Sequence, residues 1–151
     1  MNAKTLFGLW SDVREGLMAA LGQLTDEQLS FTPREGLWSL GETVCHIAGC
    51  EDGWFRHVVT HELPDWEGAD YSLADYPAVE DLVGLLGEVH ARVVAYVDPL
   101  TDADLDRVIE LPWGPKVPLW WVFWHILEHE IHHRGEVYLM LGLQGMEAPD
   151  V

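Results

Sequence analysis

The sequence predicts an all-α protein, a four-helix bundle with long connecting loops. Four long segments repeat apolar residues at the three- and four-residue spacing of an amphipathic helix. The connections between them are rich in proline, glycine, aspartate and tryptophan, and no strand pattern of useful length is found. The 151 residues suffice for one domain with its own core, so we expect residues 1–151 to form a single domain.

The first two helices are identified by their apolar stripes. Residues 4–23 carry apolar side chains at helical spacing. The second helix follows Trp38, and Ser39 with Glu42 three residues later is the signature of a capping box at its start. Its expected buried stripe comprises Leu40, Val44, Ile47, Trp54 and Val58.

The remaining two helices are bounded by prolines. The third spans about residues 78–98 and stops at Pro99, because proline cannot continue a helix. The fourth opens at Pro118, which suits a first turn, and runs to about Leu143. Segments such as residues 62–77 and 110–118 are expected to be loops with at most short turns of helix. Loops of this length leave the order of the helices in the bundle open.

The charge balance excludes several classes of partner. Eight Lys and Arg against 26 Asp and Glu give a formal net charge of -18, which would repel nucleic acid and anionic membrane surfaces. No apolar run reaches the length of a membrane span, and the N-terminal stretch is unlike a secretory signal. We therefore expect a cytoplasmic protein. Cys45 and Cys50 are five residues apart, point in different directions on a helix, and are expected to stay reduced.

The segment HILEHEIHHRG, residues 125–135, holds four histidines on the fourth helix. On a helical wheel, His129 and His133 fall within its apolar stripe. Their i, i+4 spacing brings both rings to one point, as a divalent ion requires. The alternative is that they are hydrogen-bonded core residues. His125 and His132 lie at the edge of the stripe, which favours the helix surface or a place beside the ligands.

A third metal ligand must come from another helix. His46 lies beside the apolar stripe of the second helix, although it would also fit as a packed or capped histidine. Cys50, four residues later, is a rival ligand, but buried cysteine is more often a small apolar residue. Glu42, one turn before His46, would orient its ring or merely cap the helix. The other histidines carry no spacing signal and are expected to be solvated or at the edge of the core; they are His57, His61 and His90.

Residues 129–133, HEIHH, also satisfy H-E-x-x-H, the zinc protease motif whose glutamate is the general base. Such enzymes take a third ligand from downstream, but only 18 residues follow His133. In the extended form of the motif, Glu136 and Leu139 occupy the places of glycine and histidine. This interpretation is therefore disfavoured.

Two stretches, LWSLGETVCHIAG and HILEHEIHHRGEVYLML, together resemble the DinB-like, or YfiT-like, superfamily of small bacterial helical proteins. Helix lengths agree over nearly the whole chain. The resemblance implies a four-helix bundle that binds a divalent ion, commonly zinc or nickel, through three histidines, which by motif position are His46, His129 and His133. The family often has glutamine where this sequence has Glu136. Its members are frequently dimers, so a homodimer is a further expectation.

Three neutral histidines leave a coordination position for water or substrate. A metal in such a site lowers the pKa of water or holds a thiol as thiolate. Some members of the resembled family are thiol transferases. The leading expectation is therefore transfer of a low-molecular-weight thiol to an electrophilic substrate; the alternatives are a metal-dependent hydrolase and a non-catalytic, stress-associated metal-binding protein.

Two further residues are candidates for catalysis. Glu130 lies next to the ligand pair and would transfer protons, unless it lies on a solvated face. Arg134 would bind a carboxylate of substrate or thiol, unless it forms a structural ion pair with a glutamate of the second helix.

Overall fold

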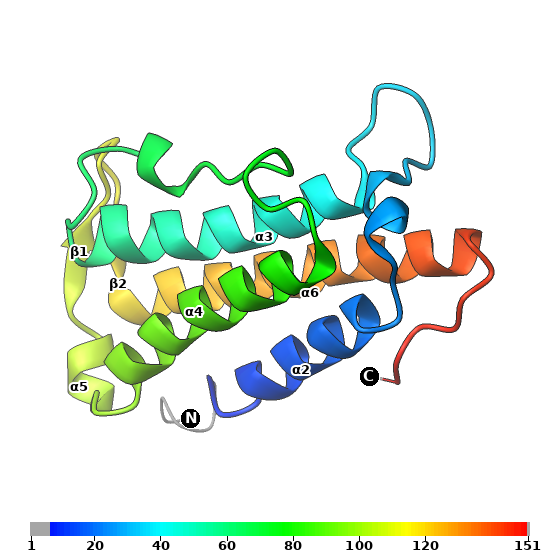
Figure 1. Cartoon of the computed structure of the whole chain (residues 1–151). Helices are drawn as coiled ribbons and strands as arrows, with labels where there is room; N and C mark the ends of the chain where they lie inside the picture. The colour runs from blue at the N-terminus through cyan, green and yellow to red at the C-terminus, as the bar shows by residue number, and fades with distance from the viewer. Residues whose placement is uncertain (1–6, 151) are drawn as a thin grey trace.

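The computed structural model describes residues 7–150 and confirms the predicted four-helix bundle (Figure 1). Residues 4–6 of the first predicted helix lie outside the described range. The second helix begins as expected, because the Ser39 amide donates to Glu42 Oε2 (2.7 Å) and the Glu42 amide donates to Ser39 Oγ (3.2 Å). The four long helices are α2 (Trp10–Leu21), α3 (Leu40–Gly53), α4 (Val79–Val97) and α6 (Leu119–Leu143).

The packing order of the helices differs from their order in the chain. α3 packs against both α4 and α6, and α2 packs against the same two helices. α2 and α3 therefore lie diagonally opposite each other, as do α4 and α6. This arrangement places the histidine-rich part of α6 alongside α3.

Shorter elements join the long helices. A 3₁₀ turn, η1 (Asp26–Ser30), precedes α3, and α3 continues into a turn of π-helix, η2 (Trp54–Val59). The π-helix ends at Val59, and two residues later His61 has a φ of 58°, in the left-handed region. Within the predicted loop of residues 62–77 lies one short 3₁₀ turn, η3 (Glu67–Ala69), as expected. A single helical turn, α5 (Asp102–Leu105), follows α4.

The expectation that residues 110–118 form a loop is wrong in part. Two short antiparallel strands, β1 (Val108–Glu110) and β2 (Lys116–Pro118), pair with Ile109 opposite Val117. Each strand has three residues, too few to show the alternation by which a strand is recognised in a sequence. Gly114, with a φ of 107°, allows the chain to turn between them.

Residues 63–74, which we call the strap, run back along α3 (green in Figure 1). The strap approaches α3 closely because two glycines face it. A Cβ atom on Gly49 would lie 2.5 Å from the Ala69 carbonyl oxygen, and one on Gly53 would lie 2.3 Å from the Trp66 ring. Only glycine therefore permits the strap to lie where it does.

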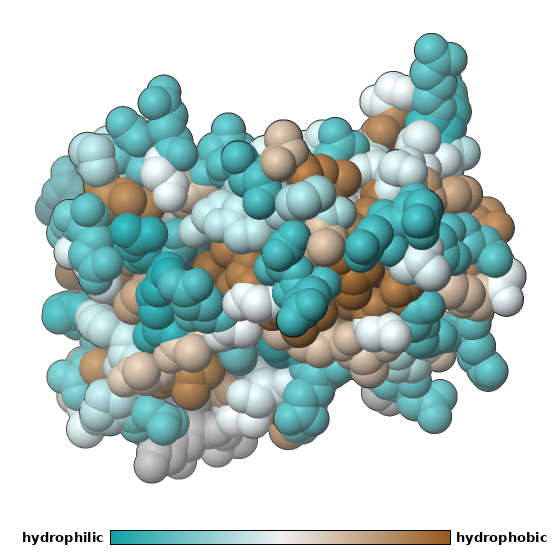
Figure 2. Space-filling view, in the orientation of Figure 1, coloured by the Kyte–Doolittle hydropathy of each residue, from teal (hydrophilic) through white to brown (hydrophobic). Residues whose placement is uncertain are grey.

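The apolar core consists of two clusters. One is centred on the end of α2 near Leu21 and the start of α3, and the other on the start of α6 and the aromatic residues Trp10 and Trp54. On the face seen in Figure 2, hydrophilic residues surround exposed patches of hydrophobic ones. Within the described part of the chain, no helix combines the length and apolarity that crossing a bilayer requires.

A buried polar layer, to which each long helix contributes one residue, separates the two clusters: Arg14, Glu51, His90 and Glu130. Arg14 Nη2 donates to Glu51 Oε2 at 2.5 Å, and Arg14 Nε donates to Glu130 Oε1 at 2.7 Å. His90 Nδ1 lies 2.9 Å from Glu51 Oε1. Burial would lower the pKa of Arg14, but the charges of Glu51 and Glu130 outweigh it and raise this pKa above its usual value. The layer thus ties all four helices together at one level.

Candidate metal centre

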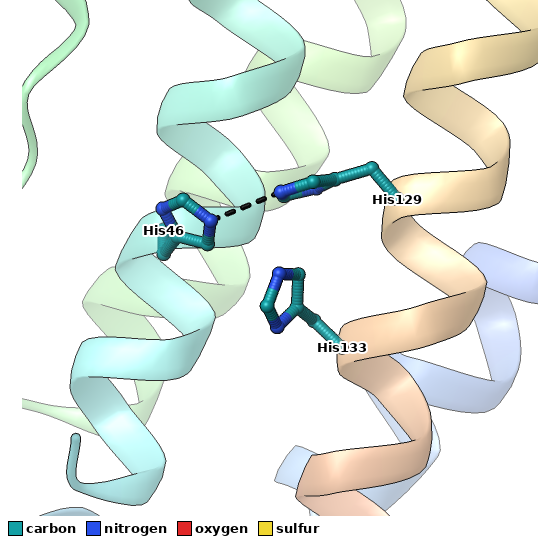
Figure 3. A group of neighbouring side chains, drawn as sticks. All are labelled: His46, His129 and His133. Atoms are coloured by element: carbon teal, nitrogen blue, oxygen red, sulfur yellow. Dashed lines mark hydrogen bonds between the residues drawn. The ribbon is translucent and has the colours of Figure 1, made fainter. Parts of the chain in front are cut away.

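Three histidine rings from two helices converge on one point (Figure 3). His46 comes from α3, and His129 and His133 come from successive turns of α6. The Nε2 atoms of His46 and His129 are 2.9 Å apart, and one ring nitrogen from each histidine lies within 4.8 Å of the others. Two ligands on a tetrahedral zinc ion would lie about 3.3 Å apart, from a Zn–N distance of about 2.05 Å. The structure therefore brings the three predicted ligands together at a spacing that suits a divalent ion.

The protonation of these rings also suits a metal. Burial lowers the pKa of His129 to about 3, helped by the neighbouring His133 and His46. Burial likewise lowers the pKa of His46. Metal binding requires neutral imidazole, so His46 and His129 need not lose a proton at neutral pH in order to bind an ion.

Glu136 fixes the orientation of the third ring. Its Oε2 lies 2.7 Å from Nδ1 of His133, whose side chain is 12% exposed. A carboxylate can only accept, so Nδ1 donates and the lone pair of neutral His133 resides on Nε2. Carboxylate support of this kind orients histidine ligands and raises their basicity. The glutamate where the resembled family often has glutamine is thus placed to support a ligand.

Trp38 covers one side of the centre. Its ring centroid lies 4.5 Å from that of His46 and 6.4 Å from that of His133. The indole is still half-exposed, so it borders the site without burying it. Trp38 directly precedes Ser39, and the capping box that starts α3 therefore also places the indole against His46, two turns further along.

A cavity of about 830 Å³ opens beside His46 and His129. It lies between α3, the strap and α6. Its volume falls in the range of small-molecule sites, which is about 300–1,000 Å³. An ion held by the three histidines would therefore border a space large enough for a substrate.

Glu130 does not face this cavity, and the sequence-based expectations for it are corrected by the structure. The residue is neither on a solvated face nor beside the reacting space: it is 1% exposed and belongs to the polar layer. Its Oε2 accepts from Trp10 Nε1 at 2.7 Å, and Arg14 binds both carboxylate oxygens. One residue after His129, the helix turns the side chain by about 100°, toward α2. A carboxylate engaged in this way is not available as the base of an H-E-x-x-H protease.

Arg134 also points away from the histidines. Its Nη1 lies 3.5 Å from the Val13 carbonyl oxygen on α2, and its guanidinium lies 5.4 Å from the centre of the Tyr138 ring. It neither lines the cavity nor pairs with a glutamate of α3. Residue 134 falls on the α2 side of α6, so Arg134 is not placed beside the three histidines.

The structure also places the other residues of α3 that were considered near the metal, Glu42 and Cys50. Glu42 caps the helix, and its pKa is lowered by the hydrogen bonds from Ser39. Cys50 lines the cavity but is not part of the group formed by the three histidines, and burial raises its pKa to about 12. Cys45 and Cys50 are both reduced, as expected.

The remaining histidines have separate roles. His125 stacks on Trp121, with ring centroids 5.2 Å apart, and lines the cavity. His132 is exposed, as expected. His57 and His61 contact nearby carbonyl oxygens on and after η2. His90 is buried in the polar layer, so its expected place at the core edge is wrong.

The polar layer was not predicted from the sequence, although its signal was present. Arg14, Glu51 and Glu130 each lie three or four residues from apolar positions of the same stripe, for example Trp10, Ile47 and Ile126. A charged residue in a buried stripe indicates a partner on a facing helix. One sequence does not reveal which charges are paired.

Comparison with known proteins assigns the family. The model of the DinB superfamily matches residues 9–137. The chain belongs to the DinB superfamily. Among DinB relatives, a Geobacillus kaustophilus protein named "Putative metal-dependent hydrolase" is 31% identical over 141 residues, covering 86% of this chain and 76% of that protein.

Solved DinB structures share the fold. A DinB-like protein from Bacillus cereus superposes with a TM-score of 0.76 at 22% identity, covering 99% of this chain and 97% of that one. YfiT from Bacillus subtilis, described as "a probable metal-dependent hydrolase with an unusual four-helix bundle topology", superposes with a TM-score of 0.75 at 21% identity, covering 96% and 89%. The family match and these superpositions confirm the predicted resemblance to DinB-like and YfiT-like proteins and the predicted four-helix bundle.

Proposed function

We propose that this DinB protein is a metal-dependent hydrolase in which His46, His129 and His133 hold one divalent ion, zinc or nickel, at the edge of the cavity. The convergence of three ring nitrogens within 4.8 Å beside an 830 Å³ cavity carries the proposal. The name of the Geobacillus relative, "Putative metal-dependent hydrolase", supports the same reaction class. When bound, such an ion supplies the Lewis acidity that makes water or a thiol nucleophilic near neutral pH.

The cysteines of the cavity are poor nucleophiles. The two cysteines in its lining are Cys45 and Cys50, and burial raises their pKa values to about 11 and 12. Both are therefore thiols at neutral pH, and the thiol is a far weaker nucleophile than the thiolate. In the proposed reaction the attacking group therefore enters from solution, as water or as a small thiol.

Two residues around the proposed position of the ion hold a ligand in place or shield the site from water. Glu136 keeps the proton of His133 on Nδ1. Trp38 restricts the approach of water on one side of His46. The substrate would therefore approach from the cavity side, where His46 and His129 are both exposed to the open space.

Thiol transfer, the reaction expected first from the sequence, remains the second candidate. Its support is the size of the cavity, which has room for a thiol and an electrophile together. Both reactions use the same three ligands, so the nucleophile alone separates them.

The test measures turnover by the full chain, purified without chelators or a histidine tag and loaded with zinc or nickel. Ester and amide substrates are assayed without thiol, and chlorodinitrobenzene-type electrophiles are assayed with and without small thiols. Hydrolysis without thiol that is lost in His133→Ala but kept in His132→Ala supports the proposal. Turnover that occurs only with thiol overturns it in favour of transfer. Metal binding without turnover of either kind overturns it in favour of a binding protein.

A further inference from the structure

The cavity beside the three histidines has a marked chemical bias. Its walls include three tryptophans and a tyrosine, together with the carboxylates of Glu42, Glu67 and Asp70. Among residues 7–150, no lysine or arginine lines it. The lining of the cavity is therefore aromatic and anionic, and it favours some substrates of the proposed reaction over others.

An aromatic wall forms the end of the cavity away from His46. The centroid of the Trp54 ring lies 5.7 Å from that of Trp66 at an angle of 82°, and 4.9 Å from that of His125. Trp66 is 37% exposed, so part of its indole is accessible. The face of an indole carries negative potential and attracts cations within about 6 Å.

Two carboxylates of the strap add to this potential. The side chains of Glu67 and Asp70 are exposed, and neither carboxylate forms an ion pair with another described residue. Asp52, which lies below the strap, is different because Arg56 (3.1 Å) and Arg92 (2.8 Å) both bind it. The cavity is therefore left with negative charge that the protein does not neutralise.

The basic side chains nearest the strap are engaged elsewhere. Besides Asp52, Arg56 pairs with Glu62 at 3.4 Å, and Arg92 pairs with Glu88. We call the end of the cavity at Trp66 and Glu67 the strap end. The net charge of -18 adds to the negative potential there, so an anion entering the strap end would be repelled.

The two ends of the cavity are separated along α3. Trp66 packs against Gly53, seven residues after His46, which corresponds to about 10 Å of helix. A metal at the histidines would make that end positive, whereas the strap end stays negative. A ligand that fits both ends would have its reacting group at the histidines and a positive group about 10 Å away.

We propose that the cavity binds organic cations, amines or quaternary ammonium compounds with an apolar body, and that the ammonium group lies against Trp66 and Glu67. Asp70 follows Ala69, which packs on Gly49, and adds negative charge nearer the histidines. The placement of the reacting group at the histidines rests on the proposed function, but the placement of the ammonium group at the strap end does not. Thiols and other substrates that carry several carboxylates are disfavoured by the same charges.

The experiment measures binding to the metal-free full chain by calorimetry at low salt, so that phenylacetate cannot bind a metal ion through its carboxylate. The two probes have similar size and opposite charge, benzyltrimethylammonium and phenylacetate. The cation is expected to bind about tenfold more tightly, with the ratio falling as salt is raised. Equal binding of the two probes, or tighter binding of phenylacetate, overturns the proposal.

A matched pair of variants locates the effect. Glu67→Gln with Asp70→Asn should reduce the preference for the cation several-fold. Glu15→Gln with Glu147→Gln removes the same charge from exposed positions outside the cavity lining and should leave it unchanged. An equal loss in both double variants would mean that only net charge matters and would overturn the assigned site.

His129→Ala separates this proposal from the metal-dependent reaction. The variant should lose bound metal and turnover but keep its preference for benzyltrimethylammonium. Loss of the cation preference in His129→Ala would contradict the assignment of the ammonium group to the strap end. Failure of the hydrolase assays with the cation preference intact would overturn the proposed reaction alone.

Discussion

The Nε2 atoms of His46 and His129 lie 2.9 Å apart although 83 residues separate them in the chain. Two lone pairs at this distance repel each other unless a shared proton or a cation lies between them. With both pKa values below the usual range, the rings are neutral at pH 7, so they can share a single proton or bind a metal ion.

Removal of one ligand should abolish metal binding without unfolding the bundle. His129→Ala is expected to lower the metal content from about one ion per chain to nearly none, because two histidines make a weak site. Elemental analysis measures the content, and circular dichroism checks the fold. His132→Ala, which alters an exposed ring on the same helix, is the control and should retain the ion. Full metal content in His129→Ala would exclude it as a ligand.

Acid should destabilise the metal-free protein through His129. Its pKa is about 3 in the folded state, against an ordinary value of 6.5. Between these values the unfolded chain binds more protons, so this contribution to stability is constant above pH 6.5 and is lost as pH falls from there toward 3. Urea unfolding at pH 7.5 and 5 measures the effect. His129→Gln should show a smaller loss between these two pH values, and an unchanged loss would contradict the assignment.

Glu136 should tune metal affinity through His133. Glu136→Ala removes the acceptor at 2.7 Å from Nδ1 and is expected to weaken metal binding about 10- to 100-fold. Glu136→Gln retains an acceptor oxygen without the charge, so its metal affinity should lie between those of the unmodified protein and Glu136→Ala. Competition with a metal-sensitive dye measures the constants. Equal affinities for all three proteins would show that the hydrogen bond has no role in metal binding.

Glu130 should matter for stability rather than for chemistry. Glu130→Ala leaves Arg14 with a single carboxylate and Trp10 Nε1 without its acceptor, so the free energy of unfolding should fall by about 3–5 kcal/mol. Glu128→Ala alters a half-exposed carboxylate on the same helix and should cost about 0.5 kcal/mol or less.

A milder change distinguishes the two roles of Glu130. Glu130→Gln should fold, although less stably, and bind metal at the normal stoichiometry. A folded Glu130→Gln protein with full metal but no turnover would restore the catalytic role expected from the sequence.

The strap should depend on glycine in α3. Gly53→Ala places a methyl group 2.3 Å from the Trp66 ring and should destabilise the protein by about 1–3 kcal/mol. Gly84→Ala adds a methyl group to open space on α4 and should stabilise by about 0.5–1 kcal/mol. Urea unfolding compares the two. If Gly53→Ala were as stable as Gly84→Ala, the strap would have to be free to move off α3.

Local signals in the sequence determined the helices. Periodic apolar residues, the Ser39–Glu42 capping box and Pro118 at the start of α6 set their limits, because these signals depend on neighbours within a few residues. The i, i+4 spacing of His129 and His133 likewise follows from helix geometry alone. The third ligand, His46, was a candidate from its place beside the apolar stripe of the second helix, and the family resemblance favoured it over a packed or capped histidine. Spacing within one helix cannot by itself name a partner on another.

Only the tertiary structure decided what surrounds these histidines. Which helices become neighbours depends on packing across the whole chain, and long loops do not restrict it. That packing places Glu130 against Arg14 instead of the cavity and turns Arg134 toward α2. It also lays the strap on Gly49 and Gly53, and so creates the cavity. The physical reason is that side-chain direction along a helix is a local property, whereas the surface that it meets is set by segments distant in the sequence.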